Sequence, residues 1–519
     1  MSDETTALTP AEQALADERV VADRVAKLAR LRDRGVEPYA YSFAPTHSAA
    51  EALDAFAAHE ERAGAEEMAE RVRIAGRVVS KRVMGKSTFA HVADRTGRIQ
   101  LYFRVNDLGE RYEVLDLVEH SDWIGAEGTL FRTRTGEVSL RVSSFELLSK
   151  ALRPLPLGKE EVDAETGERR VYSGFTDVEA RYRQRYADLA VNPEVRDTFV
   201  LRAKVVSTLR RFLDDHGFVE VETPVLQPLY GGALARPFTT HHNALDMQLY
   251  LRIAVELYLK RLIVGGMERV YEIGRNFRNE GLSRFHNPEF TMLEFYAAYW
   301  DYEDVMRFTE ELLVHVVDAV LGGGPAHFGG HEIRFQAPFA RFSMYDAIQQ
   351  IGGVDVPALD DDGLRAEVRK LGLSADEVKG MGRGKLIDEL FGALVEPKLI
   401  QPTFITDYPR EMSPLAKPKR GNPELTERFE LMVAGKELLN AYSELNDPID
   451  QRERFESQKR LALAGDEETQ PLDEDFLRAL EYGMPPTGGF GMGIDRLLMI
   501  LSGQPSIRDV ILFPAMRPE

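Results

Sequence analysis

The segments 270–278 and 288–297 alternate between apolar and polar side chains, and this alternation constrains the fold more than any other feature of the chain. Because alternate residues of a strand share a face, the two segments predict antiparallel strands joined by a loop. One face of the second strand is apolar, and the other carries Phe290, Met292, Glu294 and Tyr296. Glu272 and Arg278 have the parity of this polar face. We therefore expect a sheet with a core on one side and a charged floor on the other.

The charges on this floor have two interpretations. A buried charge without a partner costs several kcal/mol, so each one needs a counter-charge or a ligand. The floor is either a satisfied ion-pair network or a binding site for a charged molecule.

Length and composition set the class of protein. A chain of 519 residues has room for about three domains. No run of 18 apolar residues occurs, which predicts that no segment spans a membrane. The absence of cysteine excludes disulfides, thiolate zinc sites and a cysteine nucleophile. The N-terminus is acidic and lacks a basic-then-apolar leader, so we expect a cytoplasmic enzyme or binding protein.

The charge distribution points to a polyanionic partner. The net charge is −20, yet residues 71–104 contain nine Lys or Arg and a single acid, Asp94. A local excess of positive charge in an acidic chain is typical of a nucleic-acid-binding surface. The alternative is an ordinary solvated sheet face.

The same region has the element order of a small barrel. "RVRIAGRVVSKRV", "STFAHVAD" and "RIQLYFRV" predict three strands, "LGERYEVLDLV" a short helix, and the stretch 122–148 two more strands. This order fits a five-stranded OB barrel, a fold that often binds oligonucleotides on its sheet face. A helix over residues 11–34 precedes it.

A larger second domain follows a connector rich in proline and charge. It begins with a helix at 197–215, which Gly217 ends, and "FVEVETPVL" is predicted to continue as a strand. Strands and helices then alternate without the regular rhythm of a parallel sheet. We expect an α+β domain built on a mainly antiparallel sheet.

Two apparent nucleotide motifs fail. "SKRVMGKST" has Ser80 where a phosphate-binding loop needs its first glycine. "GGFGMGIDR" resembles a dinucleotide fingerprint, but only 23 residues follow Arg496, too few for the rest of that fold. No Ser/His/Asp arrangement is recognisable either.

Two other stretches suggest an ATP site of a different kind. The segment 427–447 predicts a hairpin on which Asn440, Tyr442 and Glu444 share a face, while Glu437 needs a bulge or a turn position to join them. In "GGFGMGIDRLLMILSG", glycines precede a helix that carries Arg496 in its first turn. Arginines for phosphate, acids for Mg²⁺ and an aromatic ring for a base together describe ATP binding.

These stretches resemble the signature motifs of class II aminoacyl-tRNA synthetases. "GFVEVETPVLQP" resembles motif 1, "GRNFRNE…FHNPEF" motif 2 and "GGFGMGIDR" motif 3. Further stretches, including "LYLRIAVELYLKRL", "LIQPTFITDYP", "NAYSELND" and "RDVILFPAMRP", are similar to bacterial-type lysyl-tRNA synthetases of class IIb. The resemblance covers roughly residues 15–519. It implies a helical extension at 1–68, an anticodon-binding OB domain at 69–150, a linker at 151–180 and a catalytic domain at 181–519.

The resemblance also implies residue roles. Arg278 would contact the α-phosphate of ATP and Arg496 the γ-phosphate, as the catalytic pair. The other ATP-binding residues would be Glu280, His286, Phe290 and Glu437. Mg²⁺ would be held by Glu430 and Glu437. The lysine pocket would comprise Gly232, Glu256, Glu294, Tyr296, Asn440, Tyr442 and Glu444. The anticodon would be read by Arg77, Phe89 and Gln100.

The implied reaction joins L-lysine to tRNA(Lys) through a lysyl-adenylate, catalysed by a homodimer. The pocket chemistry agrees, since an ammonium substrate needs carboxylates, and each charge-assisted bond contributes about 1.5–3 kcal/mol. We expect Glu256, Glu294 and Glu444 to face a cationic substrate, with no protein cation filling the cleft. The alternatives are an aspartyl or asparaginyl enzyme, a lysine ligase that modifies a protein, and an inactive RNA-binding relative. Arg284, Phe285 and the segment 353–384 depart from the pattern and have no assigned role.

Overall fold

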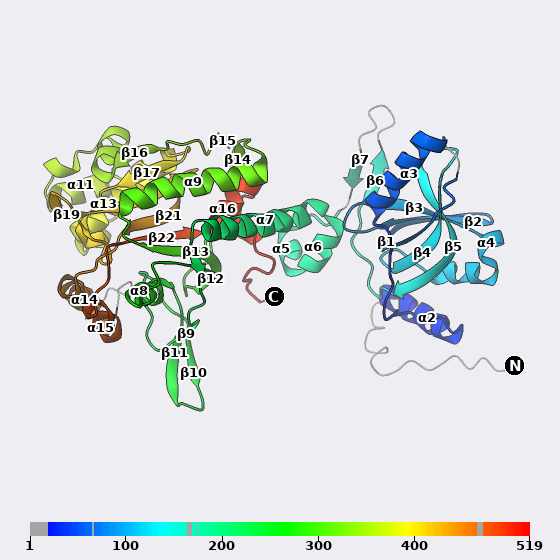
Figure 1. The fold of residues 1–519 in the computed structure, drawn as a ribbon, viewed down its shortest axis with the longest axis horizontal. Helices are drawn as coiled ribbons and strands as arrows, with labels where there is room; N and C mark the ends of the chain where they lie inside the picture. The colour runs from blue at the N-terminus through cyan, green and yellow to red at the C-terminus, as the bar shows by residue number, and fades with distance from the viewer. Residues whose placement is uncertain (1–18, 65–66, 163–168, 173, 464–470, 519) are drawn as a thin grey trace. The chain divides into compact units, whose positions relative to one another are not determined.

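The computed structural model describes residues 19–64, 67–162, 169–172, 174–463 and 471–518 (Figure 1). The chain divides into one compact unit of Met1–Asp177 with Tyr186–Val191 and a second of Val178–Arg185 with Asn192–Glu519. Within the described residues, no helix combines the length and apolar character needed to cross a membrane.

The first unit is built around a closed barrel with strand order β1-β2-β3-β5-β4. Its strands are β1 (Arg71–Met84), β2 (Ser87–Ala93), β3 (Arg98–Arg104), β4 (Trp123–Arg132) and β5 (Val138–Ser149). Buried and partly exposed residues alternate along β2 and β3, so one face of each strand fills the barrel interior. β3 and β5 pair in parallel and close the barrel. The OB fold expected from the sequence is confirmed.

Short elements surround the barrel (Figure 1). They are α2 (Arg19–Asp33), α3 (Ala49–Ala63), α4 (Val105–Leu108), the 3-10 helix η1 (Gly109–Leu117), and the strands β6 (Lys159–Val162) and β7 (Arg169–Tyr172). α5 (Val178–Arg183) and α6 (Arg185–Val191) follow. The helix predicted at 11–34 is present from Arg19 onward, and its first residues lie outside the described part of the chain.

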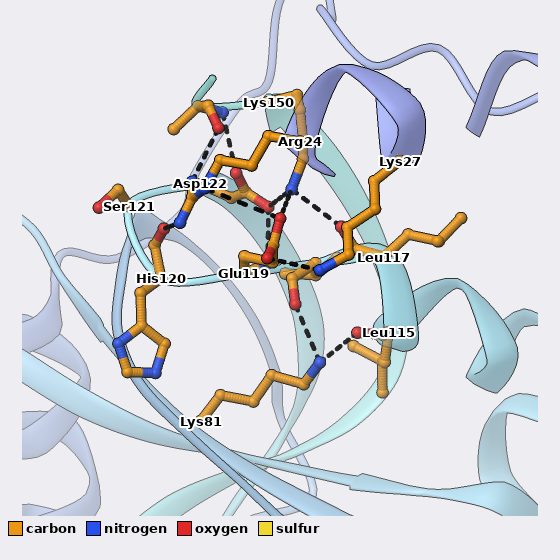
Figure 2. A network of polar contacts seen from close by, with 12 residues as sticks. Arg24, Lys27, Lys81, Leu115, Leu117, Glu119, His120, Ser121, Asp122 and Lys150 are labelled. Atoms are coloured by element: carbon orange, nitrogen blue, oxygen red, sulfur yellow. Dashed lines mark hydrogen bonds and ion pairs between the residues drawn. The ribbon is translucent and has the colours of Figure 1, made fainter. Parts of the chain in front are cut away.

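A buried lysine joins α2 to the barrel (Figure 2). The side chain of Lys150 is fully buried, and its Nζ donates to Asp122 Oδ2 at 2.9 Å, Glu119 Oε2 at 2.8 Å and the carbonyl of Leu117 at 3.0 Å. From α2, Lys27 donates to Glu119 Oε1 at 2.6 Å. Two carboxylates thus neutralise the buried ammonium, and Glu119 also holds the helix against the barrel.

This network makes the first unit sensitive to acid. Burial raises the pKa of Glu119, but hydrogen bonds from Lys150 and Lys27 more than offset this and lower the pKa to about 2. The stability from the ionised carboxylate is present above the ordinary pKa of 4.5 and is lost as the pH falls toward 2. Glu119→Gln should therefore destabilise the unit by about 1.5–3 kcal/mol at pH 7, with the difference vanishing in acid. Hydrogen exchange of β4 and β5 amides against pH measures this; a difference that persists at pH 2 would contradict it.

The second unit contains an eight-stranded sheet with order β16-β17-β20-β21-β22-β13-β12-β8. Its strands are β8 (Val219–Glu220), β12 (Arg269–Phe277), β13 (Glu289–Ala298), β16 (Ala340–Ser343), β17 (Thr403–Thr406), β20 (Arg428–Val433), β21 (Lys436–Ser443) and β22 (Thr487–Gly493). All neighbours pair antiparallel except β16 with β17 and β12 with β8. The mainly antiparallel sheet expected from the sequence is confirmed.

Three helices cover the apolar face of this sheet (Figure 1). They are α7 (Pro193–Asp215), α9 (Tyr302–Leu321) and α16 (Ile494–Ser502). Leu293 and Phe295 of β13 are fully buried in the core beneath them, as the alternation predicts. The opposite face, with Glu294 and Tyr296, is therefore left for the polar floor.

Smaller elements complete the unit. The helices are α8 (Glu256–Val264), α10 (Met344–Ala347), η2 (Ile348–Gly352), η3 (Val356–Ala358), α11 (Asp361–Arg369), α12 (Ala375–Lys379), α13 (Arg383–Leu394), η4 (Glu396–Lys398), η5 (Arg410–Met412), α14 (Pro448–Leu463), α15 (Glu474–Glu481) and η6 (Ile507–Asp509). The strands are β9 (Leu226–Gln227), β10 (Thr239–His242), β11 (Met247–Leu251), β14 (Ala326–Phe328), β15 (His331–Ile333), β18 (Pro418–Lys419) and β19 (Asn422–Thr426). The uninterpreted segment 353–384 is largely helical and packs on a core of its own.

The prediction that "FVEVETPVL" forms one continuous strand is wrong. Strand pairing stops at Glu220 and resumes only at Leu226, which pairs in a different sheet. Between them, the backbone N–H and the hydroxyl of Thr223 both donate to Glu272 Oε2, at 3.1 and 2.7 Å, and Pro224 has no N–H to donate. The hydrogen bonds of Thr223 to Glu272 take the place of strand-to-strand backbone hydrogen bonds in this segment.

Candidate active site

A cavity of about 340 Å³ lies over the polar floor of the second unit. It brings together all of the predicted ATP and lysine residues. Those that line it are Gly232, Glu256, Arg278, Glu280, His286, Phe290, Glu294, Tyr296, Glu437, Asn440, Tyr442, Glu444 and Arg496. The predicted metal residue Glu430 is not among the lining residues, and the three predicted anticodon residues lie on the barrel.

One end of the cavity combines guanidinium groups with an aromatic ring. The Arg278 guanidinium carbon lies 5.1 Å from the centre of the Phe290 ring. Burial lowers the pKa of Arg278, while the carboxylates of Glu280 and Glu437 oppose this and keep the group charged. A flat ring beside a fixed cation suits a nucleotide, with its base on the ring and its phosphates at the guanidinium.

Arg496 extends this positive end. It lies in the first turn of α16, and its Nη1 donates to the carbonyl of Glu437 at 2.6 Å. Its Nη2 lies 3.2 Å from His286 Nε2, and His286 Nδ1 lies 2.8 Å from Ser283 Oγ. Burial and the charges of Arg496 and Arg278 lower the pKa of His286. We infer a neutral imidazole that accepts from Arg496 and donates to Ser283.

A bulge turns Glu437 into the same cavity. Leu431 pairs with Leu439 while the next residue, Met432, pairs with Glu437, so Leu438 is the extra residue on β21. Residues 440, 442 and 444 face the cavity by parity, and the extra residue brings Glu437 to their side. This is the bulge that the sequence parity requires.

Glu430 faces a different set of partners. Its Oε1 accepts from Arg428 at 2.6 Å and its Oε2 from Tyr408 at 2.8 Å. Burial, together with the negative charge of Glu437, raises the pKa of Glu430. Two carboxylates that repel each other are a fitting pair for a divalent cation, although Arg428 already neutralises part of Glu430.

Glu430 and Glu437 pass a simple donor test for magnesium. Within the described ranges no group of three His, Asp or Glu side chains is arranged to hold a metal. Mg²⁺ commonly uses only one or two carboxylates and takes its other ligands from water and substrate phosphates. The two residues therefore fit a metal that arrives with a nucleotide.

The other end of the cavity is acidic. Tyr442 donates to Glu256 Oε1 at 2.8 Å, and Tyr296 donates to Glu294 Oε2 at 3.2 Å. Burial and the charge of Glu256 raise the pKa of Glu294 to about 7. Three glutamates within one buried pocket favour a cationic guest.

A protein cation, Lys260, also pairs with two carboxylates of this cluster. Lys260 Nζ lies 2.6 Å from Glu256 Oε1 and forms a second ion pair with Glu444 Oε2. Its side chain is fully buried and is not among the residues that line the cavity. Lys260 therefore lies behind Glu256 and Glu444, which form the acidic wall of the cavity, and it leaves the cleft open. The i,i+4 spacing of Glu256 and Lys260 on α8 is the sequence feature that could have predicted their ion pair.

The remaining pocket residues are fixed by close contacts. Asn440 Oδ1 accepts from Arg428 Nε at 2.9 Å, which orients its amide. Gly232 has a φ of +86°, and a Cβ there would approach Glu256 Cβ at 3.0 Å. A Cβ at Gly489 would collide with Glu444 Oε1, so glycine is needed for that carboxylate to lie against β22.

One other expectation changes, and the structure also places Arg284. Glu272 does not face the cavity, because Arg252 forms an ion pair with its Oε1 and Thr223 donates to its Oε2. Arg284 does not line the cavity either, and its carbonyl accepts from the N–H of Ile507 at 2.8 Å. Phe285 lines the cavity at this position in place of an arginine.

The predicted anticodon residues lie on three neighbouring barrel strands, Arg77 on β1, Phe89 on β2 and Gln100 on β3. Phe89 stacks on Tyr102 with ring centres 4.7 Å apart, and Arg77 lies 4.7 Å from the Trp123 ring. Gln100 donates to Glu137 Oε2 at 2.8 Å. Partly exposed aromatic rings and cations on an OB sheet suit single-stranded bases. Sequence reasoning missed Tyr102, which the period-2 alternation on β3 places beside Gln100.

Comparison with known proteins agrees with this geometry. The family described as tRNA synthetases class II (D, K and N) matches residues 177–517, and the OB-fold nucleic acid binding domain matches residues 72–148. A protein named lysine–tRNA ligase from Carboxydothermus hydrogenoformans is 53% identical over 498 residues, which cover 95% of this chain and 97% of that protein. Proteins of the same name from Porphyromonas gingivalis and Moorella thermoacetica are 53% and 51% identical over 97% of this chain, covering 86% and 99% of those proteins. The resemblance seen in the sequence is confirmed, and the chain belongs to the class II tRNA synthetases of the D, K and N family.

Proposed function

We propose that this protein attaches L-lysine to tRNA(Lys) in two steps, with ATP as the energy source. The observation that carries the proposal is the division of one cavity into a cationic end, at Arg278 and Arg496, and an acidic end, at Glu256, Glu294 and Glu444. An aspartate substrate would need a cation that faces the cavity at this end, and the neutral amide of asparagine would leave the three carboxylates without a counter-charge. The cation found there, Lys260, lies behind the acidic wall and forms ion pairs with two of its carboxylates, Glu256 and Glu444.

In the first step, a carboxylate oxygen of lysine attacks the α-phosphorus of ATP, the bond to the bridging oxygen breaks, and pyrophosphate leaves. Arg278 holds the α-phosphate and stabilises the negative charge that develops there, while Arg496 holds the γ-phosphate. Phe290 stacks on the adenine. Glu430 and Glu437 would hold Mg²⁺, which when bound neutralises phosphate oxygens. Glu294, Glu256 and Glu444 fix the substrate ammonium.

In the second step, a ribose hydroxyl of the terminal tRNA adenosine attacks the lysyl carbonyl carbon, and AMP leaves with the electron pair of the broken acyl–phosphate bond. The barrel would bind the anticodon through Phe89, Gln100 and Arg77. A homodimer and a cytoplasmic location stay predictions from the sequence resemblance.

The test of this function is ATP–pyrophosphate exchange with purified protein against a panel of amino acids. We expect exchange to require lysine and to be at background with aspartate, asparagine, arginine and methionine. Transfer of labelled lysine to tRNA(Lys) completes the test. Exchange driven by aspartate or asparagine, or no exchange with any amino acid, would contradict the proposal.

Phe89→Ala separates the two parts of this function. Stacking of one base on an aromatic ring is worth about 1–3 kcal/mol, so the KM for tRNA(Lys) should rise roughly 5- to 150-fold. Lysine-dependent pyrophosphate exchange needs no tRNA and should keep its rate in the same preparation. Equal loss of both activities would show that Phe89 supports the fold instead of binding the anticodon.

A further inference from the structure

The lysine pocket has a buried wall with a resident ammonium. Lys260 of α8 bonds Glu256 Oε1 at 2.6 Å and pairs with Glu444 Oε2, and its side chain has no exposed surface. The rings of Tyr442 and Phe476 lie 5.7 and 5.8 Å from Nζ. Phe476 belongs to an apolar cluster with Phe455 and Leu257.

The two carboxylates are the main compensation for the cost of burying this charge. Although burial disfavours the ammonium, Glu256 and Glu444 raise the pKa of Lys260, so it remains charged. Burial in turn raises the pKa of Glu444, and the ammonium of Lys260 opposes that rise. The ammonium of Lys260 and the carboxylate of Glu444 therefore each help the other to stay charged.

The geometry leaves part of each carboxylate for the cavity. Glu444 Oε2 pairs with Lys260, while Glu444 Oε1 is buried beside Gly489 and has no hydrogen-bond partner among the described residues. Glu256 and Glu444 both line the cavity, whereas Lys260 does not. One buried carboxylate oxygen thus lacks a donor at the place where a substrate ammonium would bring one.

We propose that Lys260 is a positioning residue of the amino-acid pocket, which acts from behind Glu256 and Glu444 to hold both carboxylates directed at the substrate ammonium. This inference rests on the proposed lysine-activating function. The titratable groups that face this cluster are Glu256 on α8, Glu294 and Tyr296 on β13, and Tyr442 and Glu444 on and just after β21. Arg278 also acts on Glu294, and its charge lowers the pKa of that carboxyl equally with and without Lys260. The three carboxylates together with Lys260 carry a formal charge of −2, and without Lys260 they carry −3. The additional repulsion favours uptake of a proton.

The test is the pH dependence of the KM for lysine in pyrophosphate exchange. In the unaltered protein the KM should fall as the pH rises through about 7, where Glu294 ionises. In Lys260→Met the more negative wall holds protons more tightly, so the midpoint should move up by about one pH unit. At pH 7 half of the unaltered pockets are already protonated, so a midpoint one unit higher should raise the KM at that pH about fivefold. The kcat at saturating lysine should change little, since Lys260 touches no reacting atom.

A second variant restores the charge balance. Lys260→Met combined with Glu444→Gln removes one cation and one anion, so the midpoint should return to near 7 even though the plateau KM is higher. Lys150→Met is the matched control, because Lys150 is an equally buried lysine paired with two carboxylates in the other unit. It should lower the melting temperature of the protein and leave the midpoint unchanged.

The outcomes are distinct. A folded Lys260→Met protein with an unmoved midpoint overturns the proposal. If Lys260→Met does not fold, the double variant decides. A double variant that folds and has a midpoint near 7 supports the proposal. A double variant that does not fold, or that folds with a shifted midpoint, overturns it. Absence of lysine-dependent exchange in the unaltered protein would instead refute the function on which the inference rests.

Discussion

Replacing Arg278 by alanine is expected to lower the kcat of lysine-dependent pyrophosphate exchange by about 10²–10³-fold. The reason is that its guanidinium is the cation fixed beside Phe290 at the nucleotide end of the cavity. Removing one preorganised group that stabilises transition-state charge costs about 2.7–4 kcal/mol. Steady-state exchange at saturating ATP and lysine measures the effect.

Arg275→Ala provides the control, on the strand that ends just before Arg278. Arg275 is exposed and lies on β12, where its Nε is 3.7 Å from Glu289 Oε1. An exposed pair of this kind contributes at most about 1 kcal/mol, so activity should stay within severalfold. If the two variants lose activity equally, Arg278 has no special place in the reaction.

Replacing Glu294 by glutamine should raise the KM for lysine by roughly 10- to 150-fold at pH 8. A charge-assisted hydrogen bond to the substrate ammonium is worth about 1.5–3 kcal/mol, and the amide keeps the shape without the charge. The variant should also lose its pH dependence. Burial and Glu256 raise the pKa of the Glu294 carboxyl to about 7, so it is protonated below that pH and charged above it. The KM of the unaltered protein therefore falls as the pH rises, whereas the KM of the variant stays high.

Glu289→Gln is the companion substitution for this experiment. Glu289 begins the same strand, its side chain is exposed, and it does not line the cavity. We expect the KM for lysine and its pH profile to match those of the unaltered protein. A Glu294→Gln enzyme that keeps the ordinary KM and pH profile would remove Glu294 from the substrate site.

The period-2 pattern suffices to place β13. Leu293 and Phe295 must go to the core, which forces Glu294 and Tyr296 to the opposite face, and no distant residue can change that parity. The parity of Glu437 likewise requires a bulge. These features are local, so the sequence contains them.

Partners of buried charges are not local. Glu272 has the parity of Arg278, yet Arg252 from a preceding loop takes its carboxylate out of the cavity. In the sequence, Glu256 and Lys260 look like a common surface pair on a helix. The structure shows that both are buried, with Phe476 of α15 packed beside Lys260. The fate of Glu430 depends in the same way on Tyr408, 22 residues earlier. Such pairings become visible only when the tertiary fold is known.

The single extra residue in β21 makes the length of this strand more critical than its composition. Leu438 separates Glu437, on the side proposed to bind the nucleotide, from Asn440 and Tyr442, on the side proposed to bind the amino acid. Many substitutions there would preserve both sets. Removing one residue would rotate Glu437 toward the protein interior while leaving Asn440 and Tyr442 in place. The fixed spacing between Glu437 and Asn440 therefore constrains this strand in addition to the side chains themselves.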